Sequence, residues 1–288
     1  MLTPGTCIHI VAPSGAVDVE RVEAGAAVLR SWGYAVEVAP EIRARERYLA
    51  GADAVRLRSL RAAADRALLT AGAVWMARGG YGLSRLLPEL LHRPLPSVPF
   101  IGFSDGTVLL NHHRGVALHA PVVNSLIGHA DRESLVHLRR VLGGEVPPLQ
   151  GTLWVGGEAE GRLAGGNLCV LASLAGTPGA FRGSGCIVAL EDTGEAPYKV
   201  DRLLTQLIQS GAFLGVRGFA LGTFDNGPGG EVGARTDAER DATREVLLER
   251  LSGFGVPILG ELPFGHGRAN RAFRFGPARI IEDRLVWG

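Results

Sequence analysis

Short apolar runs alternate with helix-like segments through the first half of the chain, and this alternation is the strongest constraint on its fold. The sequence predicts strands at residues 7–12, 34–38, 73–77, 99–103 and 116–119, and helices at 17–32, 53–69, 83–91 and 105–114. Strands joined in this way form a parallel sheet, because a parallel connection needs a crossover long enough to hold a helix. Ligands of such sheets bind outside the carboxyl ends of the strands. We therefore expect the functional residues directly after the predicted strands.

The pattern changes near residue 142, where the segment LGGEVPP interrupts the periodicity with glycine, proline and charge. A length of 288 residues also fits two domains, at a prior of about 150 residues each. We expect an N-terminal α/β domain over 1–141, a linker over 142–160 and a C-terminal α/β domain over 161–288. In the second domain the helix over 198–210 is the clearest, because its leucines, valine and isoleucine recur on one face.

The charge balance and the cysteines exclude several classes of protein. The chain carries 30 Lys and Arg against 29 Asp and Glu, so its overall charge does not favour a nucleic-acid or membrane partner. It has no apolar stretch of about 18 residues, and its N-terminus lacks the basic and apolar parts of a signal peptide. Cys7, Cys169 and Cys186 lie far apart without zinc-ligand spacing. We expect a cytoplasmic protein with free thiols, no metal and no cofactor.

The segment Gly102-Phe103-Ser104-Asp105-Gly106 follows an apolar strand and opens a helix. This is the G-x-S-x-G pattern of a nucleophile elbow, in which a tight strand-to-helix turn exposes a serine hydroxyl. The start of the helix also supplies free N–H groups for a developing oxyanion. The alternative is that Ser104 or Asp105 only caps the helix.

A serine nucleophile needs a histidine base, and His266 is the strongest candidate. It lies in the glycine-flanked loop Pro263-Phe264-Gly265-His266-Gly267, after a strand-like run at 257–262. The other histidines have structural interpretations. We expect His9 in the sheet core, and His92, His129 and His137 at the surface. His112, His113 and His119 do not predict a metal site, because adjacent histidines on a helix point about 100° apart.

The base needs an orienting acid, and Glu191-Asp192 directly follows the apolar run 186–190. Either carboxylate could orient His266. The resulting chain order, serine then acid then histidine, is an order that acyl hydrolases use.

The turn Arg78-Gly79-Gly80-Tyr81-Gly82 follows the predicted strand 73–77. Its glycines let backbone N–H groups approach a ligand, so the turn could bind an anion or supply an oxyanion donor. It matches neither a Walker loop nor G-x-G-x-x-G, which argues against a nucleotide. Arg78 and Tyr81 are the substrate-binding candidates, since a guanidinium can bind a terminal carboxylate through two hydrogen bonds.

Seven blocks together resemble the LD-carboxypeptidases, or muramoyltetrapeptide carboxypeptidases, which are serine peptidases of the S66 type. The blocks are IVAPSG (10–15), RYLAG (47–51), ARGGYGLSRLLP (77–88), IGFSD (101–105), GRLAGGNL (161–168), LEDTGEAPYKVDRLLTQL (190–207) and PFGHG (263–267). They lie in family order across nearly the whole chain, and the RGGYG and LEDxGExPY blocks are the most specific.

The resemblance implies a Ser104–His266–Glu191 triad, with an oxyanion hole made by the N–H of Asp105 and a glycine of the pair Gly79 and Gly80. It implies a flavodoxin-like N-terminal domain, with helices on both faces of a parallel sheet, and a swivelling-type C-terminal domain, with the site between them. It also implies cleavage of the bond before the terminal D-alanine of murein tetrapeptides during peptidoglycan recycling, and we expect a homodimer.

Three alternatives stay open. A sister branch of the family hydrolyses microcin-type aminoacyl nucleotides, and Gly106, Ala269 and Arg274 depart from the residues expected in the family. An esterase or amidase of the α/β-hydrolase type shares the elbow and the order of the triad. A non-catalytic binding module could also use two α/β lobes.

Overall fold

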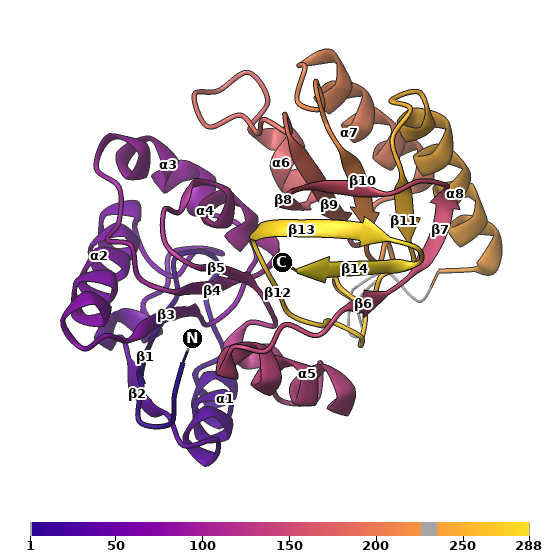
Figure 1. Cartoon of the computed structure of the whole chain (residues 1–288). Coiled ribbons are helices and arrows are strands. Elements are labelled where there is room, and N and C mark those ends of the chain that lie inside the picture. Colours follow the sequence, from indigo (N-terminus) through magenta and orange to yellow (C-terminus); the bar gives the residue numbers. More distant parts are fainter. Residues whose placement is uncertain (1, 226–234, 288) are drawn as a thin grey trace. The chain divides into compact units, whose positions relative to one another are not determined.

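Two separate sheets organise the chain in the computed structural model, which describes residues 2–225 and 235–287 (Figure 1). The chain divides into one unit comprising Met1–Glu145 with Ala272–Arg274 and another comprising Val146–Arg271 with Phe275–Gly288. Both units combine a sheet with helices, so the α/β class expected from the sequence is confirmed. The three-part domain division expected from the sequence stays a prediction.

The sheet of the first unit has the strand order β2-β1-β3-β4-β5-β12. Its strands are β1 (Cys7–Val11), β2 (Ala35–Val38), β3 (Ala73–Met76), β4 (Phe100–Gly102), β5 (Ala117–His119) and β12 (Phe273–Arg274). All neighbours are parallel except β12, which pairs antiparallel with β5. The order of the first five strands is that of flavodoxin, which confirms the expected flavodoxin-like sheet.

Helices cover both faces of this sheet. They are α1 (Val19–Ser31), α2 (Asp53–Leu69), α3 (Leu83–His92), α4 (Thr107–His112) and α5 (Arg132–Gly143). In Figure 1, α1 and α5 lie on one face and α2 and α3 on the other. The helix expected over 105–114 begins as the short 3-10 turn η2 (Ser104–Gly106), and α4 follows it.

Helix α5 lies in a segment for which the sequence analysis made no secondary-structure prediction. Asp131 caps its start by accepting from Ser134 N, and Gly144 ends it with φ 110°. The surface position expected for His137 is wrong, because His137 is buried and its Nε2 lies 2.8 Å from the Ala272 carbonyl. That carbonyl comes from the C-terminal part of the chain, so local polarity did not reveal the burial.

The sheet of the second unit has the order β6-β14-β13-β8-β9-β10-β11-β7. Its strands are β6 (Leu149–Gln150), β7 (Thr152–Val155), β8 (Ala159–Asn167), β9 (Cys186–Glu191), β10 (Gly218–Leu221), β11 (Ile258–Gly260), β13 (Gly276–Ile281) and β14 (Arg284–Trp287). The four strands β8 to β11 are parallel, and antiparallel strands flank them. The helices are α6 (Leu168–Ser173), α7 (Pro197–Gln209) and α8 (Asp237–Ser252).

The carboxyl ends of the strands indicate which loops of each unit could bind a ligand. In the first sheet the strand order reverses between β1 and β3, which is where open α/β sheets bind ligands at the carboxyl ends of their strands. In the second sheet, β9 ends at Glu191.

Within residues 2–225 and 235–287, no helix is both long and apolar enough to cross a membrane.

Candidate functional site

Ser104 lies on a strained turn directly after β4. Its φ of 60° is in the left-handed region, which side chains other than glycine rarely adopt. Backbone strain of this kind costs about 1–3 kcal/mol and is concentrated at functional sites. The glycines beside it make room for Met76, because a Cβ on Gly102 or Gly106 would lie 2.9 or 2.8 Å from the Met76 Sδ. Met76 thus explains why Gly106 departs from the larger residue expected in the family.

The glycine-rich turn lies against the Ser104 side chain. A Cβ on Gly79 would lie 2.8 Å from the Ser104 Cβ and 3.0 Å from its Oγ. The Gly79 carbonyl accepts a hydrogen bond from Gly15 N at 3.2 Å, and Gly80 has a φ of 104°. The structure therefore brings Ser104, Gly79 and the turn after β1 together within the first unit.

The Asp105 carboxylate joins three segments around this turn. Its Oδ2 accepts from Ser14 Oγ at 2.6 Å and from Leu83 N at 2.9 Å. Burial raises the pKa of Asp105, although the hydrogen bonds from Ser14 and Leu83 act in the opposite direction. Asp105 thus connects the elbow to the loop after β1 and to the start of α3.

Two positioning residues were missed by the sequence analysis. Ser14 binds Asp105, as described above, and its signal was the Pro-Ser-Gly stop directly after the first predicted strand. Arg56 is fully buried on α2 and donates to the carbonyls of Pro13, Gly51 and Gly82. Nothing in the local pattern of α2 distinguishes Arg56 from the other arginines of that helix.

Arg78 and Tyr81 lie in the same turn. Arg78 Nη1 donates to the Ala16 carbonyl at 2.8 Å, so one side of its guanidinium is held by the backbone. The Tyr81 side chain is exposed, and its ring lies 6.1 Å from that of Tyr48.

The second unit pairs His266 with Glu191. Glu191 ends β9 and is fully buried, and its Oε2 lies 2.7 Å from His266 Nδ1. The other oxygen, Oε1, accepts from Asn167 Nδ2 at 3.2 Å. The carboxylate is therefore oriented on one side by Asn167 and contacts the imidazole on the other.

Asp192 points elsewhere. Its carboxylate accepts from Cys169 N at the start of α6 and from Thr193 N, at 2.9 and 2.8 Å. Asn167 Nδ2 donates to it as well, at 3.0 Å. Of the two candidate acids, Glu191 is the one that the structure places in hydrogen-bond contact with His266.

The electrostatics of this cluster follow from burial and charge. Burial lowers the pKa of His266, but the charge of Glu191 and its hydrogen bond outweigh this effect, so the pKa is raised overall. Burial, together with the charge of Glu191, raises the pKa of Asp192 to about 7. A single negative charge on these two neighbouring buried carboxyls is therefore favoured over two. That charge lies on Glu191, next to the imidazole.

The loop that carries His266 is tightly packed. Gly265 has a φ of 124°, and a Cβ there would lie 2.3 Å from Thr223 Oγ1 and 3.2 Å from the Glu191 Cβ. Only glycine therefore fits between the end of β9 and Thr223 at this point, which explains the glycine before His266.

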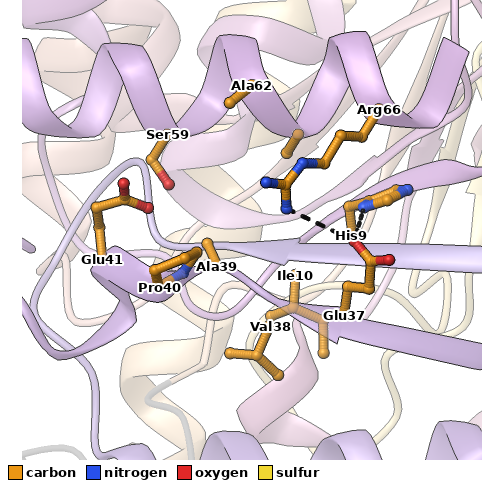
Figure 2. A pocket seen from close by; sticks show the side chains of 11 residues that line it. His9, Ile10, Glu37, Val38, Ala39, Pro40, Glu41, Ser59, Ala62 and Arg66 are labelled. Atoms are coloured by element: carbon orange, nitrogen blue, oxygen red, sulfur yellow. Dashed lines mark ion pairs between the residues drawn. The ribbon is translucent and has the colours of Figure 1, made fainter. Parts of the chain in front are cut away.

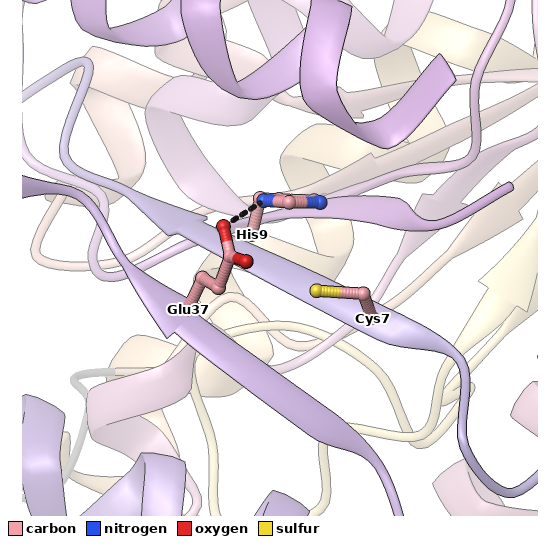
Figure 3. A group of neighbouring side chains, drawn as sticks. All are labelled: Cys7, His9 and Glu37. Carbon is pink, nitrogen blue, oxygen red and sulfur yellow. Dashed lines mark ion pairs between the residues drawn. The ribbon is translucent and has the colours of Figure 1, made fainter. Parts of the chain in front are cut away.

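Side chains that could hold a metal ion converge in the first unit. Cys7, His9 and Glu37 offer three ligand atoms within 4.8 Å of one another (Figure 3). His113 and His119, which were considered as metal ligands from the sequence, do not belong to this cluster. His113 Nε2 contacts the Val98 carbonyl, and the His119 ring stacks on Phe273 at 4.4 Å.

Comparison with known proteins identifies the same family in both units. The LD-carboxypeptidase N-terminal domain matches residues 8–119, and the LD-carboxypeptidase C-terminal domain matches residues 160–279. The murein tetrapeptide carboxypeptidase of Pseudomonas aeruginosa is 36% identical, with 97% of this chain and 94% of that protein covered.

Solved structures agree with this result. The muramoyltetrapeptide carboxypeptidase from Oxalobacter formigenes has a TM-score of 0.79 and 29% identity, covering 98% of this chain and 99% of that one. An MccF-like protein from Bacillus anthracis has a TM-score of 0.80, covering 99% and 98% of the two chains. At 20% identity, the second likeness shows a shared fold alone.

Proposed function

The chain belongs to the LD-carboxypeptidase family, and from that premise we propose that it is a serine carboxypeptidase that releases the terminal D-alanine of murein tetrapeptides. The observation that carries the proposal is the 2.7 Å contact between the buried Glu191 carboxylate and His266 Nδ1. A base oriented by an acid is what a serine nucleophile requires. Ser104, on its strained turn, is the nucleophile of the proposal.

The proposed reaction uses each group at a defined atom. Because Nδ1–H of neutral His266 donates to Glu191, its Nε2 would accept the Ser104 hydroxyl proton. Ser104 Oγ attacks the peptide carbonyl, and the protonated His266 then donates its proton to the leaving D-alanine amine. Water hydrolyses the acyl-enzyme with His266 again as base. The N–H of Asp105 and of Gly79 or Gly80 would stabilise the oxyanion, each donor contributing about 10²–10³ in rate.

This proposal requires Ser104 of the first unit to act together with His266 and Glu191 of the second. Arg78 and Tyr81 are proposed to bind the substrate, with Arg78 on the terminal carboxylate. Support for Arg78 comes from its position in the turn that lies against Ser104.

Release of D-alanine from tetrapeptides containing L-lysine or meso-diaminopimelate tests the activity. We expect Ser104→Ala, His266→Ala and Glu191→Ala each to lower turnover by about 10⁴–10⁶, with non-additive effects, because the triad acts as a unit. Asp192→Asn is the matched control and should retain most activity. Labelling by a fluorophosphonate probe should be lost in Ser104→Ala.

Three experimental outcomes would change the proposed acid, substrate or mechanism. Near-native turnover in Glu191→Ala would make Asp192 the orienting acid. Hydrolysis of an aminoacyl nucleotide without release of D-alanine would favour the microcin-type branch. A chelator that abolishes hydrolysis while the chain stays folded, with recovery on adding zinc, would overturn the serine mechanism.

We also propose a cytoplasmic location and a homodimer. The location is supported by three cysteines that are all free thiols, as expected in a reducing compartment. Analytical ultracentrifugation of the purified chain tests the oligomeric state.

A further inference from the structure

Three potential ligand side chains lie on one face of β1 and β2. Cys7 and His9 are two residues apart on β1, so both project from the same face, and Glu37 of β2 is directly opposite His9 (Figure 3). His9 Nδ1 and Glu37 Oε2 are 3.2 Å apart. Tetrahedral zinc, with ligands at about 2.0–2.3 Å, separates its ligand atoms by roughly 3.4 Å. The spacing of this pair therefore suits a shared ion, and all three ligand atoms lie within 4.8 Å.

Thr70 lies next to the second ring nitrogen of His9, Nε2. The Thr70 hydroxyl donates to the Arg66 carbonyl at 2.9 Å, and its oxygen lies 3.2 Å from His9 Nε2. A hydroxyl has a single proton, so when that proton goes to the Arg66 carbonyl the oxygen accepts from His9 Nε2–H. Nδ1 of the neutral ring then carries an electron pair.

That electron pair faces the Glu37 carboxylate, which is also an acceptor. His9 Nδ1 and Glu37 Oε2 face each other at 3.2 Å. A cation bound by both groups would use the Nδ1 electron pair and a carboxylate oxygen as its ligands. The hydrogen bond to Thr70 would at the same time hold the ring in the orientation that a metal ligand needs.

A cavity lies beside His9 and Glu37. A cavity of about 80 Å³ between α2 and the strands is lined by His9, Glu37 and Arg66, among others (Figure 2). This volume is sufficient for a water molecule as a fourth ligand. Arg66 Nη1 is 3.7 Å from Glu37 Oε2, but the Arg66 side chain is 58% exposed and can move away.

We propose that Cys7, His9 and Glu37 form a binding site for a divalent ion of the zinc type, separate from the proposed active site. A set of one sulfur, one nitrogen and one oxygen ligand suits Zn²⁺ or Co²⁺, whereas Mg²⁺ and Ca²⁺ prefer oxygen alone. The cysteine would bind as thiolate and release its proton on metal binding. The ion would join β1 and β2 at His9 and Glu37, the third residue of each strand, whereas Ser104 follows the carboxyl end of β4.

Cobalt titration of the tag-free, full-length protein tests the site. We expect one Co²⁺ per chain, with the visible absorption of a tetrahedral ion and a thiolate-to-cobalt charge-transfer band in the near ultraviolet. Added zinc should displace both signals and raise the melting temperature, because a ligand that binds only the folded state stabilises it. Cys7→Ser should abolish the charge-transfer band and weaken binding at least tenfold.

Two controls make the result specific. Cys186→Ser removes another thiol of the chain and should leave the spectrum unchanged. Glu37→Gln alters a side chain that is 53% exposed, so it should fold, and it should also weaken binding at least tenfold. The absence of stoichiometric binding, or a charge-transfer band that persists in Cys7→Ser, would overturn the proposal. An affinity unchanged in Glu37→Gln would do the same.

Discussion

At the residue scale, the contact between His266 and Glu191 makes a prediction about pH. His266 must be neutral to act as a base, and its pKa is raised above the usual value of about 6.5. The rate should therefore fall as the pH drops through a pKa above 6.5. Glu191→Gln removes the charge that raises this pKa, so His266 should titrate at a lower pH in the variant. NMR titration of the ring checks this, and an unchanged pKa would contradict it.

The raised pKa of His266 also affects the stability of the folded chain. A histidine with a raised pKa in the folded state contributes stability that is fully present below the unfolded pKa, near 6.5, and is lost as the pH rises through the folded pKa. The free energy of unfolding should fall across that window in the wild-type chain, and less so in Glu191→Gln. Urea denaturation at a series of pH values measures the difference.

Arg78 carries the second residue-scale prediction. If its guanidinium binds the terminal carboxylate, Arg78→Leu should raise KM for free-acid peptides more than for amidated peptides. Arg85→Leu is a suitable control, because Arg85 pairs with Asp53 on the surface. Equal changes in KM for the two kinds of peptide would refute the role.

At the element scale, the turn after β3 determines where the Ser104 side chain can lie. Gly79→Ala would place a Cβ 2.8 Å from the Ser104 Cβ, so the turn or the elbow must shift. A displacement of about 1 Å at a reacting group can cost about 10²-fold in rate. We expect kcat to fall by about that factor while the melting temperature changes little. Gly143→Ala is the matched control, since a Cβ there meets nothing within 4 Å, and a normal kcat in Gly79→Ala would contradict the argument.

At the scale of the whole molecule, the chain does not divide into two parts at a single point. Strand β12 comes from the C-terminal part of the sequence but pairs with β5 in the first sheet, where Phe273 stacks on His119. A fragment covering residues 1–142 would therefore lack an edge strand, and the buried faces of β5 and His119 would lose their cover. The proposed triad is also divided between the two units.

We expect fragments covering residues 1–142 and 149–288 to be inactive alone and to regain some activity when mixed. Release of D-alanine by each fragment and by the mixture is the measurement. Turnover by the first fragment alone would show that the triad is misassigned, and His112, His113 or His119 would become the base to test.

The local sequence pattern was sufficient to predict most helices and strands of the first unit. The alternation of apolar runs and amphipathic segments predicted the parallel strands, and the helix predicted over 53–69 is α2 with the same bounds. The prediction missed α5, although Leu138, Val141 and Leu142 are spaced for one buried helix face and Asp131 and Gly144 cap the helix. Only the burial of His137 against the Ala272 carbonyl depends on a distant segment.

The sequence by itself determined the α/β class, the family and the loops in which chemistry is expected, because short-range periodicity and glycine spacing encode strand ends and tight turns. The local pattern left Glu191 and Asp192 both open, and the family resemblance implied Glu191. The tertiary structure places the Glu191 carboxylate in contact with His266, since neighbouring residues of a strand point in different directions. It also decided that Cys7, His9 and Glu37 meet, because the pairing of β1 with β2 joins residues that are far apart in the chain. Strand pairing and side-chain direction depend on contacts between distant segments, and no local pattern contains them.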